Sequence, residues 1–298
     1  MKLDLLFCPF TKPSIKLASD IPTASIVYDL QHAFYPMFFS TFELAHRDMM
    51  FDQVKNEIDL CICISNNTRL DLIEKIGVPT DKALAIPINL QSKPGQSRAP
   101  SDKISQEIRK VTKEKYLLYP ANFWPHKNHQ ILLIAFAMAL KELDNADFKL
   151  ILTGELIENS ETLFQSAVTL GIGKNVKFLG FVSEQERTLL LDNAFAMIYP
   201  TLFEGFGMPL IEAIFDSVPV LCSNNSSLPE IGGDAALYFD AKKPNEICDA
   251  IVRLFADESL RRNLATNGVR QAQKYLNHDR MAQAYWKAFE TLVDEQHL

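Results

Sequence analysis

The sequence predicts an α/β protein with parallel sheets, divided into two domains. Short apolar runs alternate with longer amphipathic stretches along the 298 residues, as expected when helices cover both faces of a parallel sheet. The polar stretch Gln91–Asp102 contains two prolines and a glycine and has no apolar periodicity. We interpret it as a linker between domains, and the chain length suits two domains of ordinary size.

Each predicted strand is an apolar-rich run that is too short for a helix and is bounded by polar residues. These runs are Ser25–Tyr28, Leu60–Ile64, Tyr116–Tyr119, Phe148–Leu152, Val176–Leu179, Ala196–Tyr199 and Val218–Cys222. The predicted helices are longer and repeat apolar residues at helical spacing. They are His129–Leu143, Ser160–Leu170 and Asp279–Val293.

Composition excludes some classes of function. The formal net charge is −7, and an acidic chain lacks the concentrated Lys and Arg that nucleic-acid binding requires. The cysteines lie mostly in apolar runs, with no CxxC pair that matches a second His or Cys pair. We interpret them as buried thiols of a reducing compartment, neither disulfides nor zinc ligands. They are Cys8, Cys61, Cys63, Cys222 and Cys248.

The predicted location is the cytoplasm, with peripheral contact at the inner face of a membrane as an alternative. No run of about 18 apolar residues suggests a membrane-spanning helix. Asp4 interrupts the short apolar start where a signal peptide would need apolar residues.

The segment Tyr199–Glu212 is the most informative for function. It follows a predicted buried strand and contains a Gly-x-Gly turn, with Pro209 near the start of the next helix. A glycine-rich turn before a helix presents free backbone N–H groups and the positive end of the helix dipole, which suits a phosphate or diphosphate. Gly205 and Gly207 would let the backbone approach such a ligand closely.

Two carboxylates flank this turn, Glu204 before it and Glu212 inside the helix. A carboxylate only accepts hydrogen bonds, so it suits sugar hydroxyls, which donate them. The alternative is that both acids are merely favoured by the helix dipole. The combination of strand, glycines, proline and two acids favours the sugar-binding interpretation.

Glu204–Glu212 resembles the E-x7-E signature of the family-4 (group 1) retaining glycosyltransferases. Ser227–Ala236 resembles the P-E-x-x-G-D-A-A segment that follows it in that family, and Pro219-Val220 resembles the intervening strand. Val176–Val182 resembles the family's strand and loop beside the nucleotide base, and Thr153-Gly154 the end of a neighbouring strand. The resemblance is continuous over residues 116–256.

The resemblance implies the GT-B fold, in which two Rossmann-like domains face a cleft. Residues 1–95 would form a partial N-terminal, acceptor-side domain, and residues 96–298 the C-terminal domain that binds the nucleotide sugar, with the C-terminal helices. Glu212 would bind the ribose hydroxyls, and Glu204 would lie near the transferred sugar. The diphosphate would be held by the backbone of Gly205, Phe206, Gly207, Met208, Pro209 and Leu210. Gly154, Phe181 and Val182 complete the donor-binding residues that the resemblance implies.

Lys127 and Asn122 follow the first strand of the predicted C-terminal domain. They match a family position where a basic pair, spaced five apart, neutralises the donor diphosphate. Lys127 matches the lysine, whereas Asn122 stands where an arginine is usual and brings no charge. The alternative is that Lys127 is a solvated loop lysine.

The segment Tyr28–Pro36 resembles the family's D-x-x-H region in the N-terminal domain. There, a histidine points into the cleft beside the transferred sugar, so the resemblance implies a catalytic role for His32 together with Glu204. The alternative is a structural histidine. The apolar stretch Phe34–Phe39 is interpreted as core or domain contact, and a membrane surface or lipid-linked acceptor is its alternative partner.

The resemblance implies a retaining, metal-independent hexosyltransferase that moves a sugar from a nucleoside-diphosphate sugar to a glycan or lipid-linked acceptor. Surface polysaccharide synthesis is the expected process, and no cofactor is expected besides the donor substrate. The family's N-terminal domain is usually longer and opens with a glycine-rich loop, which this sequence lacks. An inactive or split-enzyme donor-binding fragment that needs a partner chain is therefore the alternative.

Two further classes fit the residues less well. A sugar-nucleotide epimerase or a phosphorylase shares the fold, but a phosphorylase would need a cofactor lysine motif that is not evident. A dinucleotide-dependent dehydrogenase is disfavoured because Leu210 stands where the third glycine of G-x-G-x-x-G belongs.

Overall fold

The computed structural model describes residues 3–12, 21–90, 104–144, 147–155 and 160–295. Its contacts divide the chain into two compact units. The first comprises Met1–Asn89, Glu204–Phe206 and Tyr275–Leu298, and the second comprises Leu90–Phe203 and Gly207–Lys274. The predicted linker, Gln91–Asp102, lies entirely outside the described residues, so its role stays a prediction.

The first unit contains a four-stranded sheet in the order β1-β2-β3-β4, with every neighbouring pair parallel. The strands are β1 (Leu6–Cys8), β2 (Thr23–Val27), β3 (Leu60–Cys63) and β4 (Ala83–Ala85). The helical elements are α1 (Gln31–Phe34), η1 (Pro36–Phe38), α2 (Thr41–Glu57), α3 (Asn66–Asp71), the π-helical turn η2 (Leu72–Ile76), η3 (Thr80–Lys82) and α12 (His278–Glu295).

The two long helices of this unit take part in separate apolar clusters. α2 starts at a capping box in which Ser40 and Glu43 satisfy each other's backbone N–H groups, and it buries Phe51 and Val54. α12 contributes Leu292 and five partly buried residues to a second cluster, which includes Ile62 of β3. Burial of apolar surface against the sheet, at about 25 cal/mol per Å², accounts for the place of α12 in this unit.

The second unit contains a six-stranded parallel sheet in the order β10-β9-β8-β5-β6-β7. The strands are β5 (Tyr116–Pro120), β6 (Lys149–Thr153), β7 (Val176–Phe178), β8 (Ala196–Tyr199), β9 (Val220–Ser223) and β10 (Ala236–Phe239). The helical elements are α4 (Gln106–Val111), η4 (Pro125–Lys127), α5 (His129–Leu143), α6 (Ser160–Thr169), α7 (Glu184–Asp192), α8 (Met208–Phe215), α9 (Leu228–Gly232), η5 (Gly233–Ala235), α10 (Pro244–Ala256), α11 (Glu258–Ala272) and η6 (Gln273–Tyr275, whose last residue belongs to the first unit).

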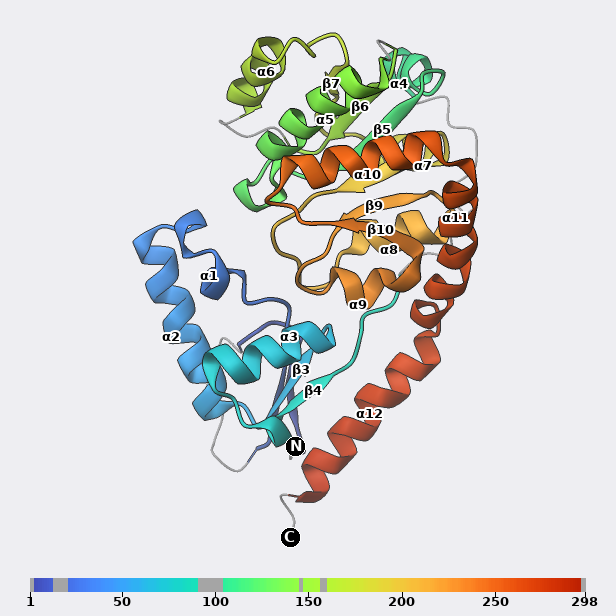
Figure 1. The fold of residues 1–298 in the computed structure, drawn as a ribbon. Coiled ribbons are helices and arrows are strands. Elements are labelled where there is room, and N and C mark those ends of the chain that lie inside the picture. The colour runs from blue at the N-terminus through green and yellow to red at the C-terminus, as the bar shows by residue number, and fades with distance from the viewer. Residues whose placement is uncertain (1–2, 13–20, 91–103, 145–146, 156–159, 296–298) are drawn as a thin grey trace. The chain divides into compact units, whose positions relative to one another are not determined.

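Strands and helices of the second unit pack as the apolar pattern requires. All four residues of β8 and of β9 are buried, because helices cover both faces of a parallel sheet. α5 and α10 pack side by side (Figure 1). Tyr116 is fully buried in β5 and its hydroxyl donates to the Leu190 carbonyl at 2.5 Å, so this buried polar atom is satisfied.

The strand order places a topological switch point between β5 and β8. From β5 the chain proceeds outward through β6 and β7, then returns to β8 on the other side of β5 and proceeds to β10. This is the doubly wound Rossmann order, and ligands of such sheets bind outside the carboxyl ends of the strands at the switch point. The loops after β5 and β8 are therefore where a ligand site is expected.

The α/β fold class with parallel sheets is confirmed, and all seven predicted strands are present within two residues. β1, β4 and β10 were not predicted, since they are short and only partly buried. The contacts group Tyr275–Leu298 with the first unit, whereas the sequence analysis assigned everything after residue 96 to the C-terminal domain. The apolar face of α12 against β3 is the physical reason for this difference.

Candidate functional site

Backbone hydrogen bonds join the loops at the carboxyl ends of three neighbouring strands in the second unit. Ala121 N–H, just after β5, donates to the carbonyl of Thr153 at the end of β6 over 2.9 Å. Gly154 N–H in turn donates to Gly180 O, after β7, over 2.9 Å. The loops that carry the predicted donor-binding residues Asn122, Gly154 and Phe181 are thus fixed to one another.

Gly154 is required at this junction. Its φ is +140°, and a Cβ there would lie 2.4 Å from the carbonyl oxygen of Ala121. The side-chain oxygen of Asn122 accepts the next amide, Glu155 N–H, at 2.9 Å. Asn122 therefore joins these two loops, and its amide NH₂ is the group that could donate to a phosphate.

Lys127 lies at the switch point. Its Nζ is 3.4 Å from the hydroxyl of Tyr199, the last residue of β8, and 5.4 Å from the centre of that ring. The Lys127 carbonyl accepts from the Tyr119 hydroxyl at 2.7 Å. The structure therefore brings the predicted phosphate-binding lysine of the β5 loop to the start of the β8 loop.

Asn128 holds the turn that presents Lys127. It adopts the left-handed conformation with φ +61°, which asparagine tolerates better than most residues. Its buried amide donates to Pro200 O at 3.0 Å and to Ala241 O at 2.7 Å. Leu202 N–H also donates to the carbonyl of His126 at 2.7 Å, so the loops after β5 and β8 are directly connected.

His129 is a neutral neighbour of Lys127. Its ring packs between Tyr119 and Phe123, with centroid distances of 4.8 and 4.5 Å. Burial, together with the positive charges of Lys127 and His126, lowers the pKa of His129 to about 3. The imidazole is therefore uncharged at neutral pH, and Lys127 supplies the positive charge in this turn.

The helix after the glycine-rich turn begins as predicted. Gly207 is the N-cap of α8 with φ +95°, and Pro209 is the second helical residue. The carbonyl of Gly207 accepts from Leu210 N–H at 3.0 Å and Ile211 N–H at 3.3 Å. Among the described residues, no backbone hydrogen bond has the amide of Gly207 or Met208 as its donor. Those two N–H groups, at the positive end of the helix dipole, suit an anion.

Glu212 forms an ion pair that the sequence analysis did not identify. Nη1 of Arg187, in α7, contacts Oε2 of Glu212, in α8. The two side chains are 35% and 27% exposed, so the pair is half-buried at the surface of the second unit. Glu212 thus has a cationic partner, while one face of the pair remains open to solvent.

Arg187 follows the loop that was predicted to lie beside the nucleotide base. In that loop, the side chain of Phe181 is 86% exposed, and Val182 is half-buried. Ser183 caps α7, and Arg187 N–H donates to its carbonyl at 2.8 Å. Through Arg187, the base-side loop and the predicted ribose-binding carboxylate are therefore connected.

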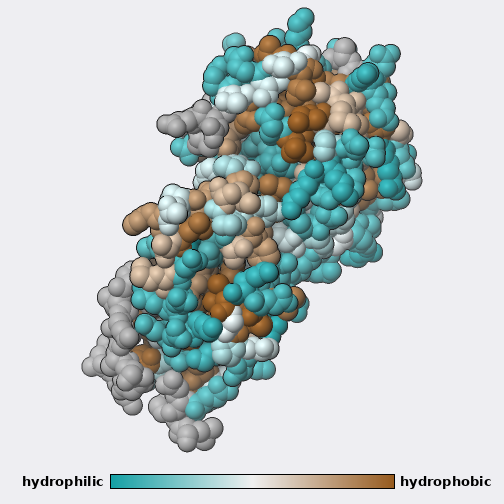
Figure 2. Space-filling view, turned by 60° about the vertical axis from the view of Figure 1, so that its left-hand side comes forward, coloured by the Kyte–Doolittle hydropathy of each residue, from teal (hydrophilic) through white to brown (hydrophobic). Residues whose placement is uncertain are grey.

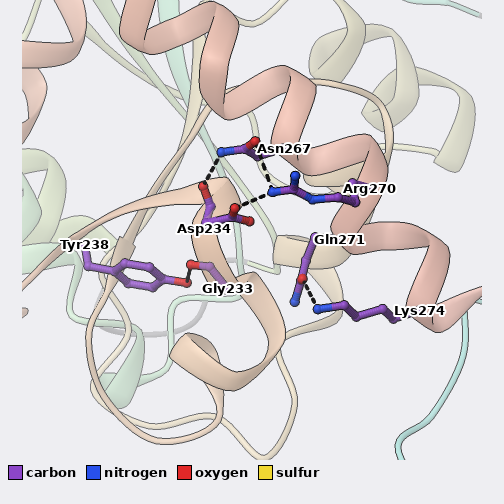
Figure 3. Close-up of polar contacts among 7 residues, drawn as sticks. All are labelled: Gly233, Asp234, Tyr238, Asn267, Arg270, Gln271 and Lys274. Carbon is purple, nitrogen blue, oxygen red and sulfur yellow. Dashed lines mark hydrogen bonds and ion pairs between the residues drawn. The ribbon is translucent and has the colours of Figure 1, made fainter.

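The segment that resembles P-E-x-x-G-D-A-A is held by α11. Asp234 forms an ion pair with Arg270, and its carbonyl accepts from the side chain of Asn267 at 3.0 Å (Figure 3). The buried Gln271 donates to Ile231 O at 2.7 Å and accepts from Lys274 Nζ at 2.6 Å. These contacts give Asp234 a structural explanation, which is to fix the loop between α9 and β10 against α11.

The other two predicted contributors, His32 and Glu204–Phe206, belong by their contacts to the first unit. His32 is only 3% exposed and stacks on Phe51 with 5.0 Å between ring centres. Burial, with the nearby charge of Arg47 as a smaller cause, lowers the pKa of His32. Within the part of the chain that the structure describes, its Nδ1 has no hydrogen-bond partner, and its catalytic role stays a prediction.

The side chains of Phe206 and Leu210 are buried, so only their backbone could contact a donor. This agrees with the backbone role predicted for Gly205–Leu210. The core interpretation of Phe34–Phe39 is wrong, since none of these residues is buried and Met37 is 72% exposed. Phe42 nearby is 80% exposed, and Figure 2 shows apolar surface between polar areas on the side of α1 and α2.

The prediction of buried thiols is confirmed, since all five cysteines are free and buried, and the reducing compartment stays a prediction. Burial raises the pKa of Cys61 to about 12, which keeps its thiol protonated and unreactive at neutral pH. No helix among the residues that the structure describes combines the length and apolar character needed to cross a membrane. One group in the described ranges, Glu142 of α5 with Cys248 and Asp249 of α10, has metal-ligating atoms within 4.8 Å of one another.

The family model of the group 1 glycosyl transferases matches residues 100–271, more than half of the chain. The chain belongs to the group 1 glycosyl transferases. O-antigen chain mannosyltransferase B of Escherichia coli is 30% identical over 219 residues, which cover 72% of this chain and 56% of that protein. O-antigen chain mannosyltransferase RfbU of Salmonella typhimurium is 34% identical over 134 residues, covering 45% of this chain and 36% of that protein. The chain thus spans about half the length, or less, of these relatives.

Solved structures of similar fold include sucrose-phosphate synthase from Thermosynechococcus elongatus. That structure has a TM-score of 0.73 and 20% identity, covering 92% of this chain and 69% of the other. Anabaena Alr3699/HepE in complex with UDP and glucose has a TM-score of 0.73 and 18% identity, covering 91% and 72%. WaaG, a glycosyltransferase involved in lipopolysaccharide biosynthesis, has a TM-score of 0.70 and 15% identity, covering 91% and 74%. These likenesses support the predicted fold class of this group 1 glycosyl transferase.

Three residues of this group 1 glycosyl transferase were absent from the predicted site. They are Asn128, His129 and Arg187, and each contacts or orients a predicted residue. No signal for Arg187 exists in the sequence, because its partner Glu212 lies on another helix and no spacing rule relates the two. Asn128 gave no such signal because its partners, Pro200 and Ala241, lie far along the chain, and His129 gave none because its burial depends on how the rings of Tyr119 and Phe123 fold onto it.

Proposed function

We propose that this chain transfers a sugar from a nucleoside-diphosphate sugar to a glycan or lipid-linked acceptor in surface polysaccharide synthesis. The observation that carries the proposal is the placement of Lys127 at the switch point of a Rossmann sheet, with the α8 N-terminus following the adjacent strand. Family membership and the O-antigen mannosyltransferase relatives support the same class of reaction.

In this proposal the second unit binds the donor. Lys127 and the amides of Gly207 and Met208 stabilise negative charge that grows on the leaving diphosphate. Glu212 accepts hydrogen bonds from the ribose diol, and the exposed ring of Phe181 lies on the base side. Asn122 donates one uncharged hydrogen bond where a second cation would be stronger.

Transfer with retention, without a metal ion, is the proposed mechanism. The bond between the anomeric carbon and the diphosphate breaks, and the acceptor oxygen attacks the same face of the sugar. The leaving phosphate takes the acceptor's proton. Glu204 and His32 would orient the sugar, and such positioning of reactants can supply several kcal/mol of the barrier reduction.

The test is a transfer assay with GDP-mannose, UDP-glucose, UDP-N-acetylglucosamine and dTDP-rhamnose, using a membrane extract as the acceptor source. GDP-mannose is the first donor to test, because the relatives are named mannosyltransferases. We expect release of one nucleoside diphosphate, unaffected by EDTA, with the product linkage in the donor's anomeric configuration by NMR. Lys127→Met should lower the rate about 10²- to 10³-fold, the usual loss for one group that stabilises transition-state charge.

Lys149→Met is the matched control, since Lys149 is the first residue of β6 and the proposed site lies at the opposite, carboxyl ends of the strands. We expect it to retain wild-type transfer. Equal losses in both lysine variants would contradict the placement of the diphosphate.

A further inference from the structure

We propose that Arg187 is a positioning residue that orients the carboxylate of Glu212 toward the ribose diol of the donor nucleotide. This inference rests on the proposed nucleotide-sugar function. Arg187 was not among the site residues predicted from the sequence.

The geometry of the pair supports this role. Nη1 of Arg187 contacts only one of the two carboxylate oxygens of Glu212, namely Oε2. A carboxylate has about four acceptor positions, so Oε1 and the remaining position on Oε2 can accept from two neighbouring hydroxyls. The partial exposure of both side chains leaves room for such a ligand.

Arg187 is itself held on a fixed support. The carboxylate of Glu186 accepts from Ser183 N–H at 3.1 Å and from Ser105 N–H, at the start of α4, at 3.1 Å. The start of α7 is thus attached both to its own cap and to a second helix of the same unit. A guanidinium on a fixed backbone restricts the rotation of the carboxylate that it contacts.

The energetic argument concerns the free protein. A glutamate side chain without a partner samples several rotamers, and binding a sugar hydroxyl fixes one of them at a cost in conformational entropy. The ion pair selects one orientation before the nucleotide arrives, so less conformational entropy is lost on binding. The effect should therefore depend on the ribose hydroxyls that Glu212 accepts from.

The experiment measures binding of GDP, UDP and their 2′-deoxy forms by calorimetry. For whichever base binds the wild type, Arg187→Met should weaken the ribonucleotide about tenfold, equivalent to about 1.4 kcal/mol, and the 2′-deoxynucleotide far less. Glu212→Gln should show the same selectivity, and adding Arg187→Met to it should cause no further loss. Arg187→Lys should be intermediate, because an ammonium keeps the charge without the planar fork.

Arg270→Met is the matched control, since it breaks another arginine–carboxylate pair of the second unit (Figure 3). We expect it to leave nucleotide binding unchanged. Equal weakening of ribo- and 2′-deoxynucleotides by Arg187→Met, or additive losses in the double variant, would overturn the inference. If Glu212→Gln weakens binding and Arg187→Met does not, this inference alone fails. If the wild type binds no nucleotide, the proposed function fails with it.

Discussion

At the scale of single residues, the candidate site combines the cation of Lys127 with neutral, buried supports. Lys127 keeps its ammonium near Tyr199, while Asn128 and His129 beside it are buried and fix the turn. The sequence could predict Lys127 and Glu212 from their spacing around recognisable turns. It could not predict His129 as a neutral support, because its burial depends on the rings of Tyr119 and Phe123.

The buried His129 predicts a specific pH dependence of stability. Its pKa is about 3 in the folded protein and about 6.5 when unfolded. Between these values the unfolded chain binds the extra proton, so stability is lost as the pH falls below about 6.5. From about pH 7.5 to about pH 5.5, we expect this group to contribute a loss of about 1.4 kcal/mol.

Urea unfolding of the wild type and His129→Phe at both pH values measures this contribution. The phenylalanine ring can replace the imidazole between the same two aromatic rings without titrating. The variant should lose less stability than the wild type over this range, by about 1.4 kcal/mol. An identical pH dependence in the two proteins would show that His129 is not buried as a neutral ring.

At the scale of elements, the conformation of a few backbone positions decides where helices begin. The sequence predicted the start of α8 because Gly-x-Gly followed by proline is a local signal. It did not predict the ion pair between α7 and α8, since no spacing rule relates Arg187 to Glu212 across an intervening strand. The short edge strands β1 and β10 were missed for a similar reason, because a three- or four-residue run has little periodicity.

Gly207→Ala tests the start of α8. Its φ of +95° disfavours any side chain, and a Cβ would lie 2.6 Å from Cδ2 of Leu228. We expect a loss of about 2 to 4 kcal/mol, from backbone strain plus overpacking. Gly171→Ala is the control, since Gly171 has φ +75° but no atom within 4 Å of the added Cβ. It should lose only the strain, about 1 kcal/mol.

Urea denaturation of both glycine variants separates the two effects. If the losses were equal, the close approach of Leu228 to the turn would not contribute, and the packing described around the α8 N-terminus would be incorrect.

At the scale of the whole molecule, the chain consists of two α/β units of different size, each with its own parallel sheet. The sequence analysis recognised the α/β class from alternating apolar runs, and it recognised the family from motifs in the second unit. It assigned the C-terminal helix to the C-terminal domain, whereas contacts group α12 with the first unit, because its apolar face packs on β3, which lies far earlier in the chain. Such long-range packing leaves no local trace in the amino-acid pattern.

The central claim is that the second unit binds a nucleoside diphosphate at the carboxyl ends of β5 and β8. Calorimetric titration of UDP, GDP and dTDP into the purified chain, with Lys127→Met and Glu212→Gln alongside, tests it most directly. The account predicts binding of one nucleotide that is weakened about tenfold or more in each variant. Unchanged affinity in both variants, or no binding to the well-folded wild type, would contradict it.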